Sequence, residues 1–166
     1  MPKSKRISDE DLVAIAKVYP HWTWADGDDD DDRNMTDGYL FHPTDPDATL
    51  RCYVRGTDWD ECTLTFRWQH RRPNWTKEQS DWWKMLNGIG NRHLIFRHSH
   101  SGREHVLLLE RRDIVEWLII NAGTFSVRKN KGYDDGTDWS FVVVPVSRVR
   151  EAGIKMQDIA LGEPNA

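Results

Sequence analysis

The stretch that decides the fold is HLIFRHSHSGREHVLLLE, residues 93–110. Two runs with alternating apolar residues flank Ser101-Gly102, and a glycine-containing pair between such runs is typical of a two-residue hairpin turn. A turn centred there places His98 directly opposite His105, with Cβ atoms about 5 Å apart. The stretch therefore predicts an antiparallel hairpin.

Upstream, LRCYVR (50–55) and ECTLTFRW (61–68) are a second pair of short runs, with GTDWD between them. We expect these runs to form a second hairpin, which would place Cys52 opposite Cys62 on its buried face. In a reducing compartment, two such cysteines are more often small core residues than a disulfide.

Helix signals flank these strands. Ser8 is a suitable N-cap for a first helix that ends at Pro20, and Thr76 with Gln79 matches the capping box of another helix. The apolar run at 113–123 predicts a helix that is buried on nearly every side. The segments with helix signals are 8–20, 76–90, 113–123 and 147–153.

In the second of these helices, Trp82, Leu86 and Ile89 share one face, which we expect to point into the core. Two more strands are expected at 124–129 and 138–146. The order of elements predicts an α+β fold. Its sheet would be mostly antiparallel, built from two hairpins plus C-terminal strands, with three to four helices packed on it.

The chain has 166 residues, of which 38% are hydrophobic, and we expect a single domain over 1–166. Its expected irregular parts are an exposed acidic loop at 26–34, where consecutive aspartates repel one another, and a short tail from about residue 160. The sequence shows no secretory leader, no apolar run long enough to span a bilayer, and only two cysteines. We therefore expect a cytoplasmic protein without a membrane partner.

Charge is unevenly distributed along the chain. Residues 24–61 hold twelve acidic side chains against three arginines, whereas residues 62–112 hold ten Lys or Arg against four acids and add five histidines. Such polarity suggests a charged partner. The alternative is that the two segments neutralise each other in the folded chain.

One short motif occurs twice, as YVRGTDW at 53–59 and as YDDGTDW at 133–139. Turn chemistry accounts for every shared residue, because glycine permits a positive φ and Thr and Asp side chains bond nearby backbone amides. The alternative uses the acids. If the strands that follow are neighbours, Asp58 and Asp138 could converge on Mg²⁺ and support a metal-dependent phosphodiesterase or nuclease.

The histidines of HSHSGREH could also hold a metal, with His98, His100 and His105 as zinc ligands. No HExxH or CxxC motif supports this, and the favoured alternative is that the histidines form the polar rim of a core strand. If the protein is an enzyme, we expect its catalytic residues among Asp58, Asp138, His98 and His105. Because no motif for covalent catalysis is present, we expect binding without catalysis and without a cofactor.

Residues 67–84, RWQHRRPNWTKEQSDWWK, interleave cations with tryptophans. Cations meet phosphates and planar rings stack on bases, so the segment is suited to single-stranded or structured nucleic acid. Trp68 and Trp82 fall on core stripes, whereas Trp75 and Trp83 fall outside them and are expected to be exposed. We expect nucleic acid to contact Arg67, Arg71, Arg72, Trp75, Lys77, Trp83, Arg97 and Arg103.

A protein-binding inhibitor or adaptor is the alternative function. A small tryptophan-rich chain with an aspartate run suits a basic protein partner, such as a nucleic-acid enzyme, because the aspartates could mimic phosphates. Phage or mobile-element proteins of the anti-defence or immunity type have this general character, by analogy only.

Overall fold

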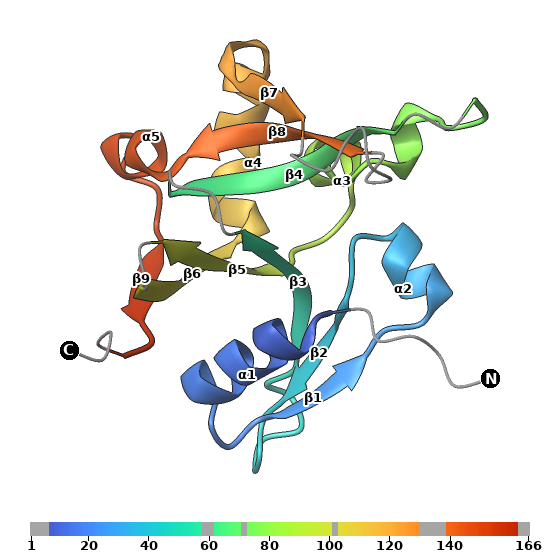
Figure 1. Cartoon of the computed structure of the whole chain (residues 1–166). Coiled ribbons are helices and arrows are strands. Elements are labelled where there is room, and N and C mark those ends of the chain that lie inside the picture. Colours follow the sequence, from blue (N-terminus) through green and yellow to red (C-terminus); the bar gives the residue numbers. More distant parts are fainter. Residues whose placement is uncertain (1–6, 58–61, 71–72, 101–102, 130–138, 163–166) are drawn as a thin grey trace.

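The computed structural model describes residues 7–57, 62–70, 73–100, 103–129 and 139–162. These residues form an α+β fold in which five α-helices pack on a six-stranded and a three-stranded sheet (Figure 1). The predicted fold class is therefore confirmed. Among the described residues, no helix is long and apolar enough to cross a membrane.

The larger sheet contains the 93–110 stretch at its centre. Its strands lie in the order β1 (Thr23–Asp26), β2 (Gly38–Phe41), β3 (Leu50–Thr57), β5 (His93–His100), β6 (Arg103–Glu110) and β9 (Gln157–Ala160). Neighbours are antiparallel except β3 and β5, which are parallel. The β5–β6 hairpin is confirmed, with His98 opposite His105. Its expected turn, Ser101-Gly102, lies outside the described residues.

The smaller sheet contains the strand that we expected to pair with β3. It has the order β4 (Thr63–His70), β8 (Trp139–Pro145) and β7 (Ser126–Lys129), all antiparallel. The expected hairpin between 50–55 and 61–68 is therefore wrong, although both segments are strands. Alternation identifies the two faces of a strand but not its partner.

The expected pairing of the two cysteines is wrong for the same reason. Cys52 is buried in the six-stranded sheet, where its register partners are Gly38 and His93. Cys62 precedes β4 and is exposed.

Two of the expected helix caps are confirmed. The first helix, α1 (Asp9–Val18), begins after Ser8, whose Oγ accepts a hydrogen bond from the backbone N–H of Asp11 at 3.1 Å. Thr76 and Gln79 form the predicted capping box, here on a short 3-10 helix. The remaining helical elements are η1 (Lys77–Gln79), α3 (Asp81–Asn87), α4 (Arg111–Asn121), η2 (Ala122–Thr124) and α5 (Val146–Glu151).

The prediction of an acidic loop at 26–34 is wrong, because this segment contains α2 (Asp29–Arg33). The Asp28 side chain accepts from the Asp31 N–H at 2.9 Å, and the Asp31 side chain accepts from the Asp28 N–H at 3.0 Å. Aspartates at a helix N-terminus satisfy free amides and interact favourably with the helix dipole. These contacts compensate for the repulsion between neighbouring carboxylates.

Two helices bury less apolar surface than expected. Ile89 is 91% exposed because α3 ends at Asn87, and Met85 takes its place in the core. On α4, Ile119 and Ile120 are 52% and 74% exposed, so the prediction that this helix is buried on nearly every side is wrong. A continuous apolar run does not indicate which face of a helix is buried, and α4 buries only the face that carries Ile114 and Leu118.

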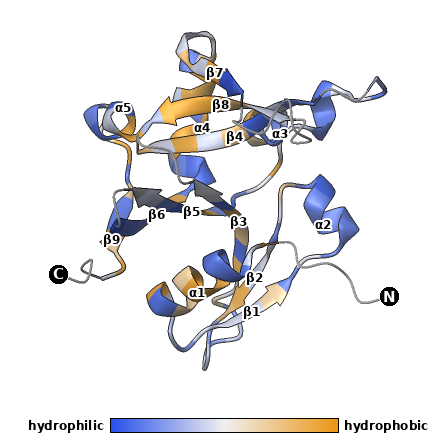
Figure 2. Cartoon of the chain, viewed as in Figure 1, coloured by the Kyte–Doolittle hydropathy of each residue, from blue (hydrophilic) through white to orange (hydrophobic). Residues whose placement is uncertain are grey.

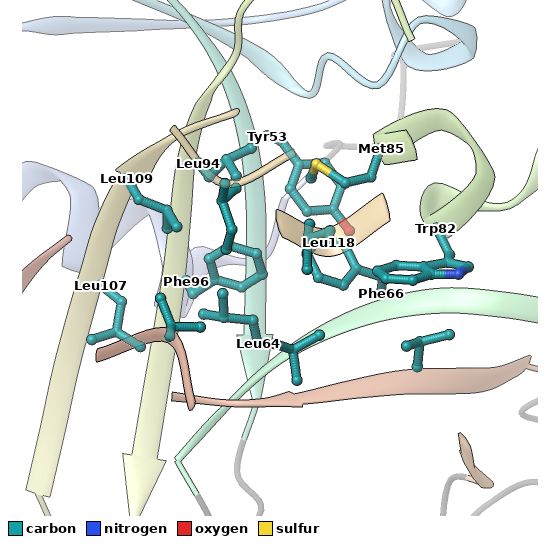
Figure 3. Packing of buried hydrophobic residues seen from close by; sticks show 14 of the residues in the cluster. Tyr53, Leu64, Phe66, Trp82, Met85, Leu94, Phe96, Leu107, Leu109 and Leu118 are labelled. Carbon is teal, nitrogen blue, oxygen red and sulfur yellow. The ribbon is translucent and has the colours of Figure 1, made fainter. Parts of the chain in front are cut away.

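The core lies on both faces of the six-stranded sheet. On one face, α1 packs against residues such as Val54, Ile95 and Val106. On the other face, Phe96 packs against Phe66 of the smaller sheet, and Phe66 in turn packs against Trp82 of α3 (Figure 3). Figure 2 shows the resulting contrast between the largely hydrophobic β8 and the hydrophilic α2.

Two edge strands, β1 and β9, were not predicted. Each has four residues, which is too short for an alternation pattern to stand out. β9 pairs with β6 from His105 to Leu108, so residues 157–160 complete this edge of the six-stranded sheet.

Candidate nucleic-acid interface

The exposed end of β4 differs from the rest of the strand. The β4–β8 register shifts between Arg67 and Gln69, so Trp68 is the extra residue of a β-bulge. Leu64 and Phe66 are fully buried as predicted, but Trp68 is 38% exposed. The prediction of Trp68 as a core residue is therefore wrong, because the bulge breaks the alternation that would have buried it.

Four side chains gather at the start of β8, and we call them the Trp139 cluster. The Arg67 guanidinium lies over the Trp139 ring, 5.5 Å from its centroid. His70 and Trp75 meet the same ring edge-on, at centroid distances of 4.7 and 6.4 Å. Arg67 is exposed and the three rings are half-buried, so the cluster is open to solvent on one side.

The Trp139 cluster borders a cleft of about 470 Å³ between α2, η1, α3 and the β4–β8 pair, which we call the α2–α3 cleft. Its walls carry three acidic and three basic side chains. They are lined by Asp32, Arg33, Arg67, Glu78, Gln79, Asp81, Lys84 and Trp139. The acidic and the basic segments of the sequence therefore meet at one place. Lys84 Nζ donates to the main-chain carbonyl of Asp32 at 3.2 Å, which links α3 to α2 across the cleft.

A carboxyl group with a strongly shifted pKa lies near this cleft. Burial raises the pKa of Asp37 to about 7, and the charges of Asp81 and Asp32 act in the same direction. The carboxyl accepts a hydrogen bond from the Val54 N–H at 2.8 Å, which opposes the rise in pKa. Asp81 in turn accepts from the buried Tyr53 hydroxyl at 3.0 Å. These carboxyls are held by main-chain and tyrosine donors.

The predicted phosphate contacts fall into different environments. Arg67, Lys77 and Arg103 are exposed, as a phosphate contact requires. Arg97 is only 7% exposed, and its guanidinium forms ion pairs with Asp11 at 2.6 Å and Glu10 at 3.4 Å. Arg97 therefore serves as an internal counter-ion. Arg71 and Arg72 lie outside the described residues.

Trp75 and Trp83 are half-buried rather than fully exposed. The Trp75 ring contacts Trp139, and its buried Nε1 has no hydrogen-bond partner. Trp83 lies on α3, where its backbone N–H donates to the Ser80 Oγ at 3.0 Å, and no ring contact joins it to the four side chains of the cluster among the described residues. The structure thus brings Trp75 together with Arg67 but does not add Trp83 to them.

The described residues do not group the facing histidines with further metal ligands. His98 is 2% exposed, and His105 Nδ1 is 2.9 Å from the Asp158 carboxylate, which also binds Arg150 at 2.6 Å. Within the described part of the chain, no group of three or more His, Cys, Asp or Glu side chains is placed to hold a metal ion. His100 pairs with Arg103 in the β5–β6 register. Asp58 and Asp138 lie outside the described residues.

A buried hydrogen-bonded relay was missed by sequence reasoning. The Tyr19 hydroxyl lies 2.6 Å from His93 Nε2, and His93 Nδ1 lies 2.7 Å from Glu110 Oε1. Glu110 also accepts from Asn91 at 2.7 Å. The predicted hairpin register already placed His93 opposite Glu110, which was the available signal.

Trp139 was also missed as a site residue, because turn chemistry appeared to explain the whole GTDW motif.

No protein-family model, no curated protein and no solved structure matches the chain.

Proposed function

We propose that the chain binds single-stranded nucleic acid through the Trp139 cluster and the adjacent Trp68. The observation that carries this proposal is the exposed Arg67 guanidinium held 5.5 Å from the centre of the half-buried Trp139 ring. A positive charge fixed beside aromatic faces is the combination that single-strand binding uses, because bases stack on rings while cations meet phosphates.

The bulge supports the same function. It turns Trp68 outward beside Arg67, while Lys77 lies exposed on the neighbouring η1. An exposed indole costs free energy in water, and stacking on a base would remove that cost. Duplex DNA hides its base faces, so this arrangement favours single strands.

Fluorescence anisotropy with a labelled oligo-dT tests the proposal through two variants. Trp68→Ala should weaken binding about 5- to 150-fold, in line with about 1–3 kcal/mol for one base–aromatic stack. Arg67→Met should lower the slope of log K against log salt by about 1, because one phosphate contact is lost.

The matched control is Arg112→Met, which removes an exposed cation from the first turn of α4 that lines neither the α2–α3 cleft nor the hollow beside α1. It should leave both affinity and slope close to those of the unmodified chain. Equal effects of Arg67→Met and Arg112→Met would mean that net charge, rather than the cluster, determines binding.

A second candidate is binding of a basic protein partner through α2. The observation that favours it is that the aspartate run is a capped helix, with Asp29, Asp30 and Asp32 exposed in fixed positions. Fixed carboxylates can steer a cationic partner and match its charges.

Replacing Asp29 and Asp30 by Asn tests this candidate, and Asp45 and Asp47 provide the control pair on an exposed loop. Capture of a synthetic Lys/Arg-rich peptide should fall with the first pair and change less with the second. Equal losses would assign the attraction to overall acidity.

A further inference from the structure

A second hollow, of about 560 Å³, also has Arg67 in its lining. The start of α1 forms one wall and the end of β3 forms the other. It is lined by residues 7–11, 54–56, Arg67 and Arg97. We call it the α1–β3 hollow. Arg67 is shared by both cavities.

The arginines of this hollow differ in their partners. Arg97 is neutralised by Asp11 and Glu10, and it holds their carboxylates against β5. Arg55 and Arg67, by contrast, form no ion pair with any carboxylate of the described chain. The Arg55 Nε is buried and has no hydrogen-bond partner within the described part of the chain. Two arginines outside any ion pair of the described residues thus border one cavity, whose wall at the start of α1 carries the carboxylates of Asp9, Glu10 and Asp11. The nearby charge of Arg55 also opposes the rise in the pKa of Asp37.

Aromatic rings fix both of these guanidinium groups. Arg55 lies 5.4 Å from the centre of the Phe141 ring, and Arg67 lies 5.5 Å from the centre of the Trp139 ring. Phe141 and Trp139 are two residues apart on β8, so their side chains leave the strand on the same face. Stacking restricts the two cations without neutralising them, which preserves their capacity to bind an anion.

The floor of the hollow is shaped by Gly56. A Cβ atom at this position would lie 2.5 Å from Arg97 Nη2 and 2.7 Å from Asp11 Oδ1, so only glycine fits beside the ion pair. The absence of a side chain keeps the space next to Arg55 open.

We propose that the α1–β3 hollow binds a phosphate group between Arg55 and Arg67. This inference rests on the proposed function in one respect: it assigns the phosphate to the nucleotide next to the base that stacks at the Trp139 cluster. Arginine is suited to the task because its planar group of donors matches phosphate oxygens.

The test uses Arg55→Met, which keeps the length of the side chain over Phe141 and removes its charge, with Arg112→Met as the control. Two probes separate the sources of phosphate. The first is oligo-dT, measured by anisotropy at several salt concentrations. The second is inorganic phosphate, measured by amide chemical shifts of Gly56 at constant ionic strength. Thermal melting confirms that each variant is folded.

We expect Arg55→Met to reduce the affinity for oligo-dT several-fold, to lower the salt slope by about 1, and to abolish the phosphate-dependent shift of Gly56. Arg112→Met should retain all three properties. An Arg55→Met chain with unchanged affinity, slope and Gly56 shift would overturn the subsite.

The two proposals fail differently. If the unmodified chain does not bind oligo-dT but phosphate shifts Gly56 in an Arg55-dependent manner, the proposed function is wrong and the subsite holds for free phosphate. If neither probe binds, both are wrong.

Discussion

At the scale of single residues, two arginines are buried without a carboxylate partner among the described residues. Arg111 donates to the Met85 carbonyl from Nε and to the Gly90 carbonyl from Nη1, both at 2.9 Å, and Arg92 donates to the Asn34 carbonyl at 3.1 Å. Met85 belongs to α3, and Asn34 is the C-cap of α2. Carbonyls at a helix C-terminus carry partial negative charge, so the helix ends act as counter-charges.

Arg111→Met should lower the free energy of unfolding by about 2–4 kcal/mol, because two buried carbonyls lose their donors. Chemical denaturation measures this loss. Its neighbour Arg112 is exposed, and Arg112→Met should change stability by less than about 0.5 kcal/mol. Similar losses for both variants would show that the carbonyl contacts contribute little.

Asp37 gives stability a predictable dependence on pH. Its pKa is about 7 in the folded chain against an ordinary value of 3.8, so the unfolded chain ionises first as pH rises. The free energy of unfolding therefore falls progressively between about pH 4 and pH 7, by as much as about 4 kcal/mol in total. Asn at this position keeps an acceptor for the Val54 N–H and carries no charge.

Asp37→Asn should consequently be more stable than the unmodified chain at pH 8, with the difference shrinking toward pH 4. Denaturation at both pH values checks this expectation. A variant that is less stable at pH 8 would mean that the ionised carboxylate is needed for folding.

At the scale of elements, local sequence signals were sufficient to predict strands and helix caps. They were not sufficient to predict which strands pair with one another. The β5–β6 hairpin followed from its turn and alternation, whereas β3 pairs in parallel with β5, a strand well downstream, with α3 and β4 between them. No local pattern encodes that choice. The same limit applies to the site: alternation gave Arg67 an exposed position, but the bulge that exposes Trp68 depends on the register with β8.

The C-terminus of α1 is anchored by the relay that links Tyr19 to His93 on β5. Tyr19→Phe should reduce stability by about 1–3 kcal/mol, because the His93 ring is 8% exposed and its Nε2 loses a partner. Tyr39→Phe is the control, since the Tyr39 hydroxyl bonds to a carboxylate of the exposed helix α2. Equal melting temperatures for Tyr19→Phe and the unmodified chain would contradict this anchoring role.

At the scale of the whole molecule, the charge asymmetry of the sequence has two outcomes. Part of it is internal, as in the ion pairs that Arg97 forms with Glu10 and Asp11. Another part remains on Arg55 and Arg67, which both line the α1–β3 hollow, and Arg67 also lines the α2–α3 cleft. The sequence could not separate these outcomes, because net charge per segment carries no information on which side chains meet.

The most direct test of nucleic-acid binding is an anisotropy titration of the unmodified chain with oligo-dT and with a duplex of equal length, at several salt concentrations. We predict tighter binding of the single strand, with an affinity that falls linearly in log K against log salt. Absence of binding at low salt, or a preference for the duplex, would contradict a stacking surface at Trp68 and the Trp139 cluster.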